Sequence, residues 1–206
     1  NLTCQDECGV INGDNSTCQD ECGVINGDNS TCSDECGIPN GNGFIENGCC
    51  PGEINFLNQC YNIDETTELD RSDAWDSWGS GEIPSELWEL ENLTYLDLSY
   101  TLFTGGIPEE ISNLENLTHL DLAGTYIGGE IPEEIGTLAN LTYLNLHGCS
   151  LNGGVPIEIG NLTSLQVLKL NNNSLTGEIP IQIWNLPNLI DLNLYDNELY
   201  GQIPDT

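Results

Sequence analysis

Residues 90–108 read LENLTYLDLSYTLFTGGIP, and residues 114–132 repeat them closely as LENLTHLDLAGTYIGGEIP. Leucines recur in the pattern L-x-x-L-x-L, in which Leu96 and Leu98 are spaced as on one face of a strand. An apolar residue followed by proline ends each unit. These pairs recur with a period of 24 residues: Ile83-Pro84, Ile107-Pro108, Ile131-Pro132, Val155-Pro156, Ile179-Pro180 and Ile203-Pro204.

A fixed period of this length predicts a solenoid in which each repeat forms one turn. One repeat cannot bury its apolar face alone, so successive turns must stack and share a core. The predicted fold class is therefore an α/β-type repeat solenoid. Short parallel strands such as TYLDL should lie on the concave face, and the GxIP segments should return along the convex side.

This part of the chain resembles the plant-type leucine-rich repeat family, whose motif LxxLxxLxLxxNxLxGxIPxxIxN is followed closely over residues 90–206. The resemblance implies a recognition module. At the asparagine position of the motif, the sequence instead has smaller donors in the first three turns, so we expect fewer hydrogen bonds there. That column reads Thr101, Thr125, Cys149, Asn173 and Asn197, and we expect Cys149 to be a buried free thiol.

Composition and period divide the chain into three segments. Residues 1–48 are Cys-rich 14-residue tandem repeats, predicted to form a disulfide-stapled, loop-rich stalk. Residues 49–65 are a Cys-rich linker or N-terminal cap, and residues 66–206 are the solenoid, with an irregular first repeat. The chain begins within a motif, so we expect it to be a trimmed segment of a longer protein.

The tandem repeats resemble DECGVCGGDGSTC-type units and, more distantly, calcium-loaded thrombospondin type-3 repeats. They contain too few large apolar residues to form a hydrophobic core, so covalent bonds or metal must hold them. Acidic side chains among turn-forming residues suit Ca²⁺, although no D-x-D-x-D-G loop is present and a solvated acidic surface is the favoured explanation. The candidate ligands are Asp6, Glu7, Asp14, Asp20, Glu21 and Asp28, and no other cofactor is expected.

Ten cysteines, nine of them in the first 60 residues, indicate an oxidising, extracellular compartment. Zinc is disfavoured because the C-x3-C pairs have no histidine nearby. Short C-x3-C rings remain an alternative to pairing across the longer gaps. The favoured pairing is Cys8–Cys18, Cys22–Cys32, Cys36–Cys49 and Cys50–Cys60, with Cys4 bonded to an upstream repeat and Cys149 free.

Sequons for N-glycosylation are dense, which also indicates a secreted or cell-surface protein. The family favours N-L-T for its own reasons, so the sequons within the solenoid have an alternative explanation. We predict N-linked glycans at Asn1, Asn15, Asn29, Asn92, Asn116, Asn140, Asn161 and Asn172.

A net charge of −32 makes nucleic acid and anionic membranes poor partners, because the phosphate attraction on which such binding depends becomes repulsion. No apolar run reaches ~18 residues, so no membrane insertion is expected within this segment. No motif of hydrolytic, metalloprotease or P-loop chemistry occurs either, and we expect no enzyme.

Two functions remain. Composition favours a structural or adhesive surface protein, in which uncovered solenoid ends associate end to end into filaments. The alternative is a receptor-type ectodomain that binds a peptide, protein or glycan on its concave face. Outward strand positions supply the candidate ligand-binding residues Tyr95, Asp97, His119, Asp121, Tyr143, Asn145, His147, Lys169 and Tyr195, in columns that also contain Ser99 and Ala123.

Overall fold

The computed structural model describes residue 49 and residues 52–73 and 80–202. The predicted calcium ligands, the stalk disulfides and the sequons at Asn1, Asn15 and Asn29 lie outside these residues. The chain divides into two units, residues 1–53 and residues 54–206.

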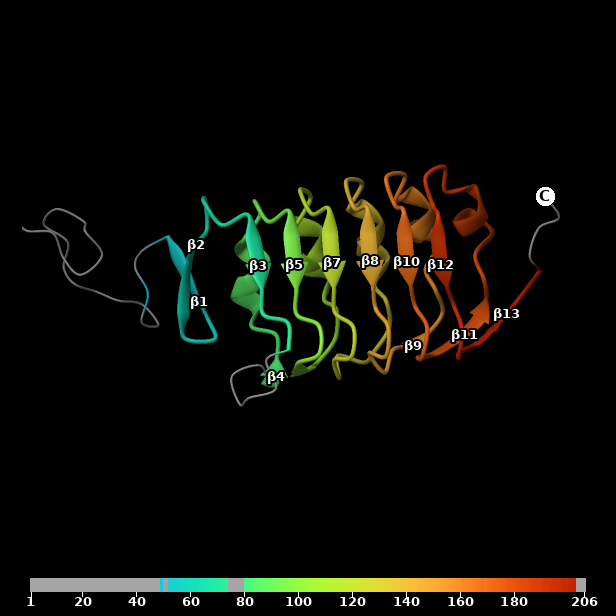
Figure 1. The fold of residues 1–206 in the computed structure, drawn as a ribbon, viewed down its shortest axis with the longest axis horizontal. Helices are drawn as coiled ribbons and strands as arrows, with labels where there is room; N and C mark the ends of the chain where they lie inside the picture. Colours follow the sequence, from blue (N-terminus) through green and yellow to red (C-terminus); the bar gives the residue numbers. More distant parts are fainter. Residues whose placement is uncertain (1–48, 50–51, 74–79, 203–206) are drawn as a thin grey trace, which may run out of the picture. The chain divides into compact units, whose positions relative to one another are not determined.

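Six short parallel strands stand side by side in one sheet, one from each successive turn (Figure 1). Each strand is in register with its neighbour, so that Leu96 pairs with Leu120 and Leu120 with Leu144. The predicted fold, a leucine-rich solenoid with short parallel strands, is confirmed. The strands are β3 (Glu68–Asp70), β5 (Tyr95–Asp97), β7 (His119–Asp121), β8 (Tyr143–Asn145), β10 (Val167–Lys169) and β12 (Asp191–Asn193).

The core is one continuous column of leucine and isoleucine side chains inside the turns. The four leucines of the first full repeat, Leu90, Leu93, Leu96 and Leu98, have no exposed surface. Their equivalents in the next turns are buried in the same way, because the register places each leucine against its copy in the neighbouring turn. Burying one such side chain contributes about 1.5–3 kcal/mol, so stacking is the main source of stability.

On the convex side, each turn makes one 3-10 helix that follows the proline of its Ile-Pro or Val-Pro pair. Each proline is the N-cap residue, and its carbonyl accepts the first hydrogen bond of the helix, as that of Pro84 does from the N–H of Leu87 at 3.1 Å. Within the described residues, no helix is long and apolar enough to cross a membrane. The helices are η1 (Ser85–Glu89), η2 (Glu109–Asn113), η3 (Glu133–Thr137), η4 (Ile157–Asn161) and η5 (Ile181–Asn185).

Between the six-stranded sheet and the helices, the turns form further parallel strand pairings that the sequence did not predict. β4 pairs with β6, and β9, β11 and β13 make a three-stranded sheet. Single bridges, such as that between Thr104 and Tyr126, link turns that lie between these two sheets. The bounds are β4 (Ser80–Glu82), β6 (Leu102–Thr104), β9 (Asn152–Gly153), β11 (Ser174–Glu178) and β13 (Glu198–Tyr200).

Each turn leaves its strand through one residue with a left-handed backbone. Tyr100 occupies this position with φ 53°, and Gly124 occupies it in the next turn with φ 68°. A Cβ built on Gly124 would lie 2.7 Å from Cδ1 of the Tyr100 ring. Tyr100 itself shows that a side chain can adopt this φ, so Gly124 is needed because the tyrosine of the preceding turn fills the space beside it.

In the column at the asparagine position of the motif, the side-chain amide of Asn173 forms hydrogen bonds to two successive turns, as the motif predicts. The Nδ2 of Asn173 donates to the carbonyls of Leu146 and Leu170 at 2.7 and 2.9 Å. Its Oδ1 accepts the backbone N–H groups of Cys149 and Leu151, each at 3.0 Å. One amide therefore satisfies donors and acceptors in two successive turns.

The smaller residues of that column make fewer bonds. Thr101 and Thr125 each donate to the carbonyl three residues earlier in their own turn, at 2.7 Å. The thiol of Cys149 donates to Leu122 of the preceding turn at 3.0 Å. Cys149 is buried and free, as predicted, and burial raises the pKa of its thiol to about 11.

The predicted disulfides Cys36–Cys49 and Cys50–Cys60 are wrong, because Cys49 is bonded to Cys60. Cys60 lies on β2 (Gln59–Asn62), which forms a two-stranded sheet with β1 (Glu53–Phe56). The two-residue connection between these strands has positive φ at both positions, as in a tight hairpin. The hairpin reverses the chain within the segment that separates the two bonded cysteines.

Phe56 of the hairpin is fully buried and packs on Phe103 of the first full turn, with ring centroids 5.9 Å apart. Arg71 lies over the ring of Tyr61 at 5.6 Å and donates to Gln59. These contacts cover the leucines of the first turn at the beginning of the solenoid.

Candidate ligand-binding face

The residues that flank the buried leucine of each strand point outward and form two columns, which we call the strand face. Strand register places Tyr95, His119 and Tyr143 in one column and Asp97, Asp121 and Asn145 in the other. Val167 and Lys169 continue them on β10. The structure thus brings together the first two columns that the sequence predicted.

Three aromatic rings of the first column stack face to face. The centroids of Tyr95 and His119 are 4.4 Å apart with 11° between the ring planes. Those of His119 and Tyr143 are 4.2 Å apart with 4° between the planes. The ammonium of Lys169 lies 5.8 Å from the centroid of Tyr143. The imidazole is therefore enclosed between two tyrosines, and the sequence showed the column but not this contact.

The second column is acidic and strongly hydrogen-bonded. Asp97 accepts the N–H of Ser99 at 2.9 Å and the hydroxyl of Tyr95 at 3.3 Å. Asp121, which is only 9% exposed, accepts Asn145 Nδ2 at 2.9 Å and the Tyr143 hydroxyl at 3.3 Å. The carboxylates are held by fixed donors, so their oxygens are oriented before any ligand arrives.

Burial and the aspartates shift the pKa values of the aromatic column. Burial, with a further contribution from Asp121, raises the pKa of Tyr143 to about 12. Burial also raises the pKa of Tyr95 and lowers that of His119, although the neighbouring aspartates act in the opposite direction on the imidazole. The tyrosines are thus neutral donors, and the imidazole favours its neutral form.

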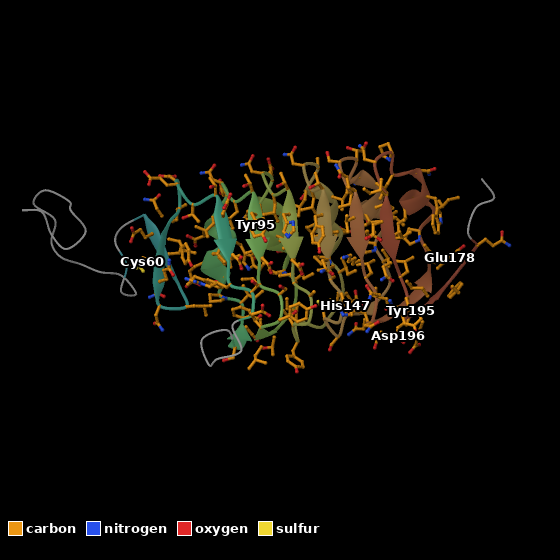
Figure 2. All side chains as sticks on the ribbon, in the orientation of Figure 1. Cys60, Tyr95, His147, Glu178, Tyr195 and Asp196 are labelled. Carbon is orange, nitrogen blue, oxygen red and sulfur yellow. The ribbon has the colours of Figure 1, made fainter. Side chains whose placement is uncertain are left out.

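A third column was expected to face outward and to contain Ser99, Ala123, His147 and Tyr195, but the structure does not form it as one exposed row. Ser99 and Ala123 are buried, at 5% and 1% exposed, so they offer a ligand almost no surface. His147 is half-buried, and its Nδ1 lies 2.8 Å from Asn171 Nδ2. Tyr195 is 77% exposed, and Figure 2 shows it and His147 beyond the strands, apart from Tyr95.

Three of the predicted glycosylation sites occupy equivalent positions in successive turns. The side-chain amides of Asn92, Asn116 and Asn140 each donate to a carbonyl of the preceding turn, at 3.0, 3.0 and 2.9 Å. Asn188 makes the same bond at 2.8 Å although it begins no sequon. Turn-to-turn bonding alone therefore explains this asparagine column. Glycans there and at the exposed Asn161 and Asn172 stay a prediction.

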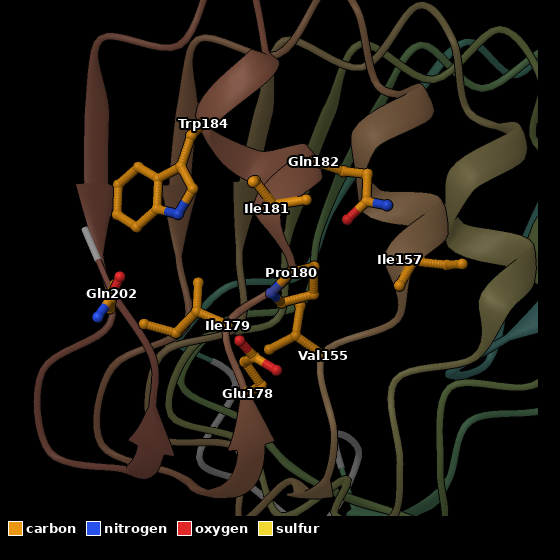
Figure 3. Close-up of a pocket in the computed structure, with 9 residues that line it drawn as sticks. All are labelled: Val155, Ile157, Glu178, Ile179, Pro180, Ile181, Gln182, Trp184 and Gln202. Carbon is orange, nitrogen blue, oxygen red and sulfur yellow. The ribbon is translucent and has the colours of Figure 1, made fainter. Parts of the chain in front are cut away.

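A hollow of about 610 Å³ lies on the convex side beside η5 (Figure 3). Ile157 and Ile181, which line it, are 58% and 64% exposed. The equivalent positions in the two preceding turns are Glu109 and Glu133, so this change from acid to isoleucine was readable in the sequence. Both surfaces are open, and neither contains a recognisable catalytic arrangement among the described residues.

Comparison with known protein families identifies the same kind of repeat that the structure shows. A family model described as a leucine-rich repeat region matches residues 80–198. A comparison with curated proteins found no match.

Several solved structures are similar. The ectodomain of the receptor kinase GASSHO1/SCHENGEN3 from Arabidopsis thaliana, in complex with CASPARIAN STRIP INTEGRITY FACTOR 2, is 35% identical with a TM-score of 0.65. The match covers 69% of this chain and 17% of that one. The Arabidopsis receptor kinase HAESA, in complex with the peptide hormone IDA and the co-receptor SERK1, is 36% identical over 61% of this chain and 21% of that one, with a TM-score of 0.59.

A plant ice-binding protein is also similar, at 34% identity and a TM-score of 0.57, over 65% of this chain and 41% of that one. The chain therefore spans less than half the length of each of these three proteins. The fold is a repeat solenoid similar to these receptor ectodomains, and such a fold is typically a non-catalytic binding domain. The chain belongs to the leucine-rich repeat family.

Proposed function

We propose that the solenoid is a non-catalytic extracellular recognition module that binds an extended peptide segment of a protein partner along the strand face. The observation that carries this proposal is the pair of adjacent, in-register columns in which stacked rings lie beside fixed carboxylates. Such a surface is rigid before binding, so a ligand loses little of its binding energy to ordering the protein.

Peptide is favoured over glycan because of how the rings are arranged. Sugars bind tyrosine by lying on the face of the ring. The inner faces of Tyr95 and Tyr143 cover His119 at 4.4 and 4.2 Å, and Lys169 lies over Tyr143. Apart from the outer face of Tyr95, ring edges and hydroxyls remain, and these suit peptide groups and cationic side chains.

The charges indicate the chemistry of the peptide. Asp97 and Asp121 lie side by side, and Asp70 extends their column onto β3. A lysine or arginine side chain would pair with this column. Lys169, three strands from Asp97, would pair with an acidic group further along. Six strands at ~4.8 Å intervals accommodate roughly seven extended residues.

The similar structures support the same class of function. HAESA is solved with a peptide hormone and a co-receptor, and both it and GASSHO1/SCHENGEN3 are receptor kinases. The proposal extends an extracellular location and protein partners from those proteins to this chain. The structural or filament-forming role, with end-to-end association, remains an alternative whose main support, the tandem repeats, lies outside the described residues.

The test is selection of peptides from a phage-displayed linear library on the full chain, secreted so that its disulfides form. Asp97→Asn should weaken the selected peptides at least about tenfold, because a charge-assisted hydrogen bond is lost. Glu133→Gln removes the same charge from the exposed convex side and should change nothing.

Equal binding by wild type and Asp97→Asn would place recognition away from the strand face. A glycan array that gave saturable binding, sensitive to Asp97→Asn, while the library yielded no peptide would replace the peptide proposal with a glycan one. Binding reduced equally by Asp97→Asn and Glu133→Gln would show attraction by net charge alone.

A further inference from the structure

We propose that Asp97, His119 and Asp121 together bind one divalent transition-metal ion on the strand face. Within the described residues they are a set of potential metal ligands whose ligand atoms all lie within 4.8 Å of one another. The set combines two carboxylates with an imidazole, which is the ligand mixture of many zinc and manganese sites. The inference does not rest on the proposed peptide binding, because the metal alone tests it.

Backbone geometry brings the three side chains together. Asp97 on β5 lies directly opposite Asp121 on β7, and His119 lies two residues before Asp121 on the same face of that strand. Neighbouring strands are ~4.8 Å apart, so one ion between β5 and β7 can reach a carboxylate from each. The imidazole then approaches from the adjacent column.

The negative charges at this site favour the binding of a cation. Like charges directly opposite each other on neighbouring strands are destabilising. Neither Asp97 nor Asp121 has a lysine or arginine partner among the residues that the structure describes: Arg71 reaches Gln59 and Tyr61, and Lys169 lies over Tyr143. A divalent ion would neutralise both carboxylates at once.

His119 supplies an observation independent of the acidic pair. Both of its faces are covered by tyrosine rings, so the imidazole is fixed in orientation. Its ring nitrogens make no hydrogen bond to any residue in the described part of the chain, whereas His147 bonds Asn171. An oriented imidazole with no hydrogen-bond partner in the described part of the chain, beside two oriented carboxylates, is arranged as a metal ligand is.

The ligand types favour zinc or manganese over calcium. Calcium takes six to eight oxygen ligands, which this set does not offer, whereas imidazole suits transition metals. Three protein ligands leave at least one position open to water or to a group of a bound partner. The same carboxylates would otherwise pair with a basic side chain, so metal and a basic peptide would compete for them.

The experiment is calorimetric titration of ZnCl2 into the full chain at neutral pH, with millimolar Mg²⁺ present to occupy the diffuse acidic surface. Wild type should show a saturable site that His119→Phe removes or weakens at least about tenfold. Phenylalanine retains the stack of rings and deletes only the ligand atoms. The matched control is His147→Phe, because His147 is the other histidine of the chain and lies away from the acidic pair.

Zinc bound by cysteines elsewhere would persist in both variants, so the difference between them isolates this site. Identical titrations of wild type and His119→Phe would overturn the proposal, as would equal weakening by His147→Phe. Should His119→Phe fold poorly, Asp97→Asn leaves the stack in place and must also weaken the site. Co²⁺ substitution adds a visible spectrum that intensifies when the ion leaves water for a protein ligand set, and His119→Phe should reduce that intensity whereas His147→Phe should not.

Discussion

At the residue scale, the column at positions 101, 125, 149, 173 and 197 places different donors in the same backbone environment. Asn173 bonds groups of its own turn and of the preceding turn, whereas Thr125 bonds only Leu122 of its own turn through its hydroxyl, apart from a 3.6 Å contact with the Cys149 thiol. The amide has two donors and an acceptor on one planar group, and a hydroxyl or thiol does not. The C-terminal turns are therefore joined more strongly than the N-terminal ones.

The first prediction follows from this difference. Asn173→Ala should lower the free energy of unfolding by about 3 kcal/mol, because half-buried carbonyl and N–H groups lose their partner. Chemical denaturation monitored by circular dichroism measures the change. Asn152→Ala removes an amide of the same kind from an exposed position and should stay within about 0.5 kcal/mol of wild type. A small effect at Asn173 would mean that water replaces the amide.

At the element scale, the 3-10 helices pack closely only because some of their residues lack side chains. Gly136 in η3 is buried, and a Cβ there would lie 2.5 Å from the carbonyl oxygen of Glu158 in η4. That oxygen belongs to the backbone, so it cannot move aside alone. Gly160 in η4 similarly faces Gln182 of η5, at 2.4 Å from its Cβ.

Gly136→Ala should accordingly destabilise the solenoid by about 1–3 kcal/mol, as overpacking does. Gly106 is a suitable control, since nothing lies within 4 Å of a Cβ built there and its φ is outside the left-handed region. Gly106→Ala should be neutral or stabilise by up to about 1 kcal/mol. Thermal unfolding of both variants side by side is the measurement, and equal midpoints would show that the helices separate at little cost.

Elements also show what the sequence could and could not predict. The period of 24 fixed the register, because residues one period apart must return to the same column. The period did not predict how deeply each side chain is buried. Ser99 and Ala123 occupy a position of the repeat that was expected to be exposed, yet both are buried. The Cys49–Cys60 bond depended on a hairpin of only four residues per strand, which leaves no periodic signal. The stacking of Tyr95, His119 and Tyr143 could not be predicted from the sequence, because the position of aromatic residues in a column does not determine their rotamers.

At the scale of the whole molecule, the large net negative charge should govern how stability responds to salt. The chain carries 34 acidic and 2 basic residues, so its surface repels itself in the folded state. Unfolding moves these charges apart and relieves the repulsion. Salt should therefore stabilise this protein, whereas it weakens proteins that depend on surface ion pairs.

The third prediction is that the thermal midpoint rises as NaCl increases from about 0.01 to 0.15 M, over which the Debye length falls from about 30 to 8 Å. The measurement is made with EDTA present, so that metal binding does not contribute. A neutral osmolyte at equal osmolality is the control and should have a smaller effect. A midpoint that fell with salt would show that attractive pairs outweigh the repulsion.

The direction of the turn-to-turn bonds has a mechanical consequence. Each strand bonds only the turn before and the turn after it, and the amides of Asn92, Asn116 and Asn140 also bond from one turn to the previous one. All of these bonds lie along the line of stacking. A pull between the two ends of the solenoid loads the interfaces between turns in series, so the weakest interface opens first and the turns separate one at a time. Each would release 24 residues, or ~80 Å of extended chain. We therefore expect the described part of this protein to lengthen in steps when its two ends are pulled apart.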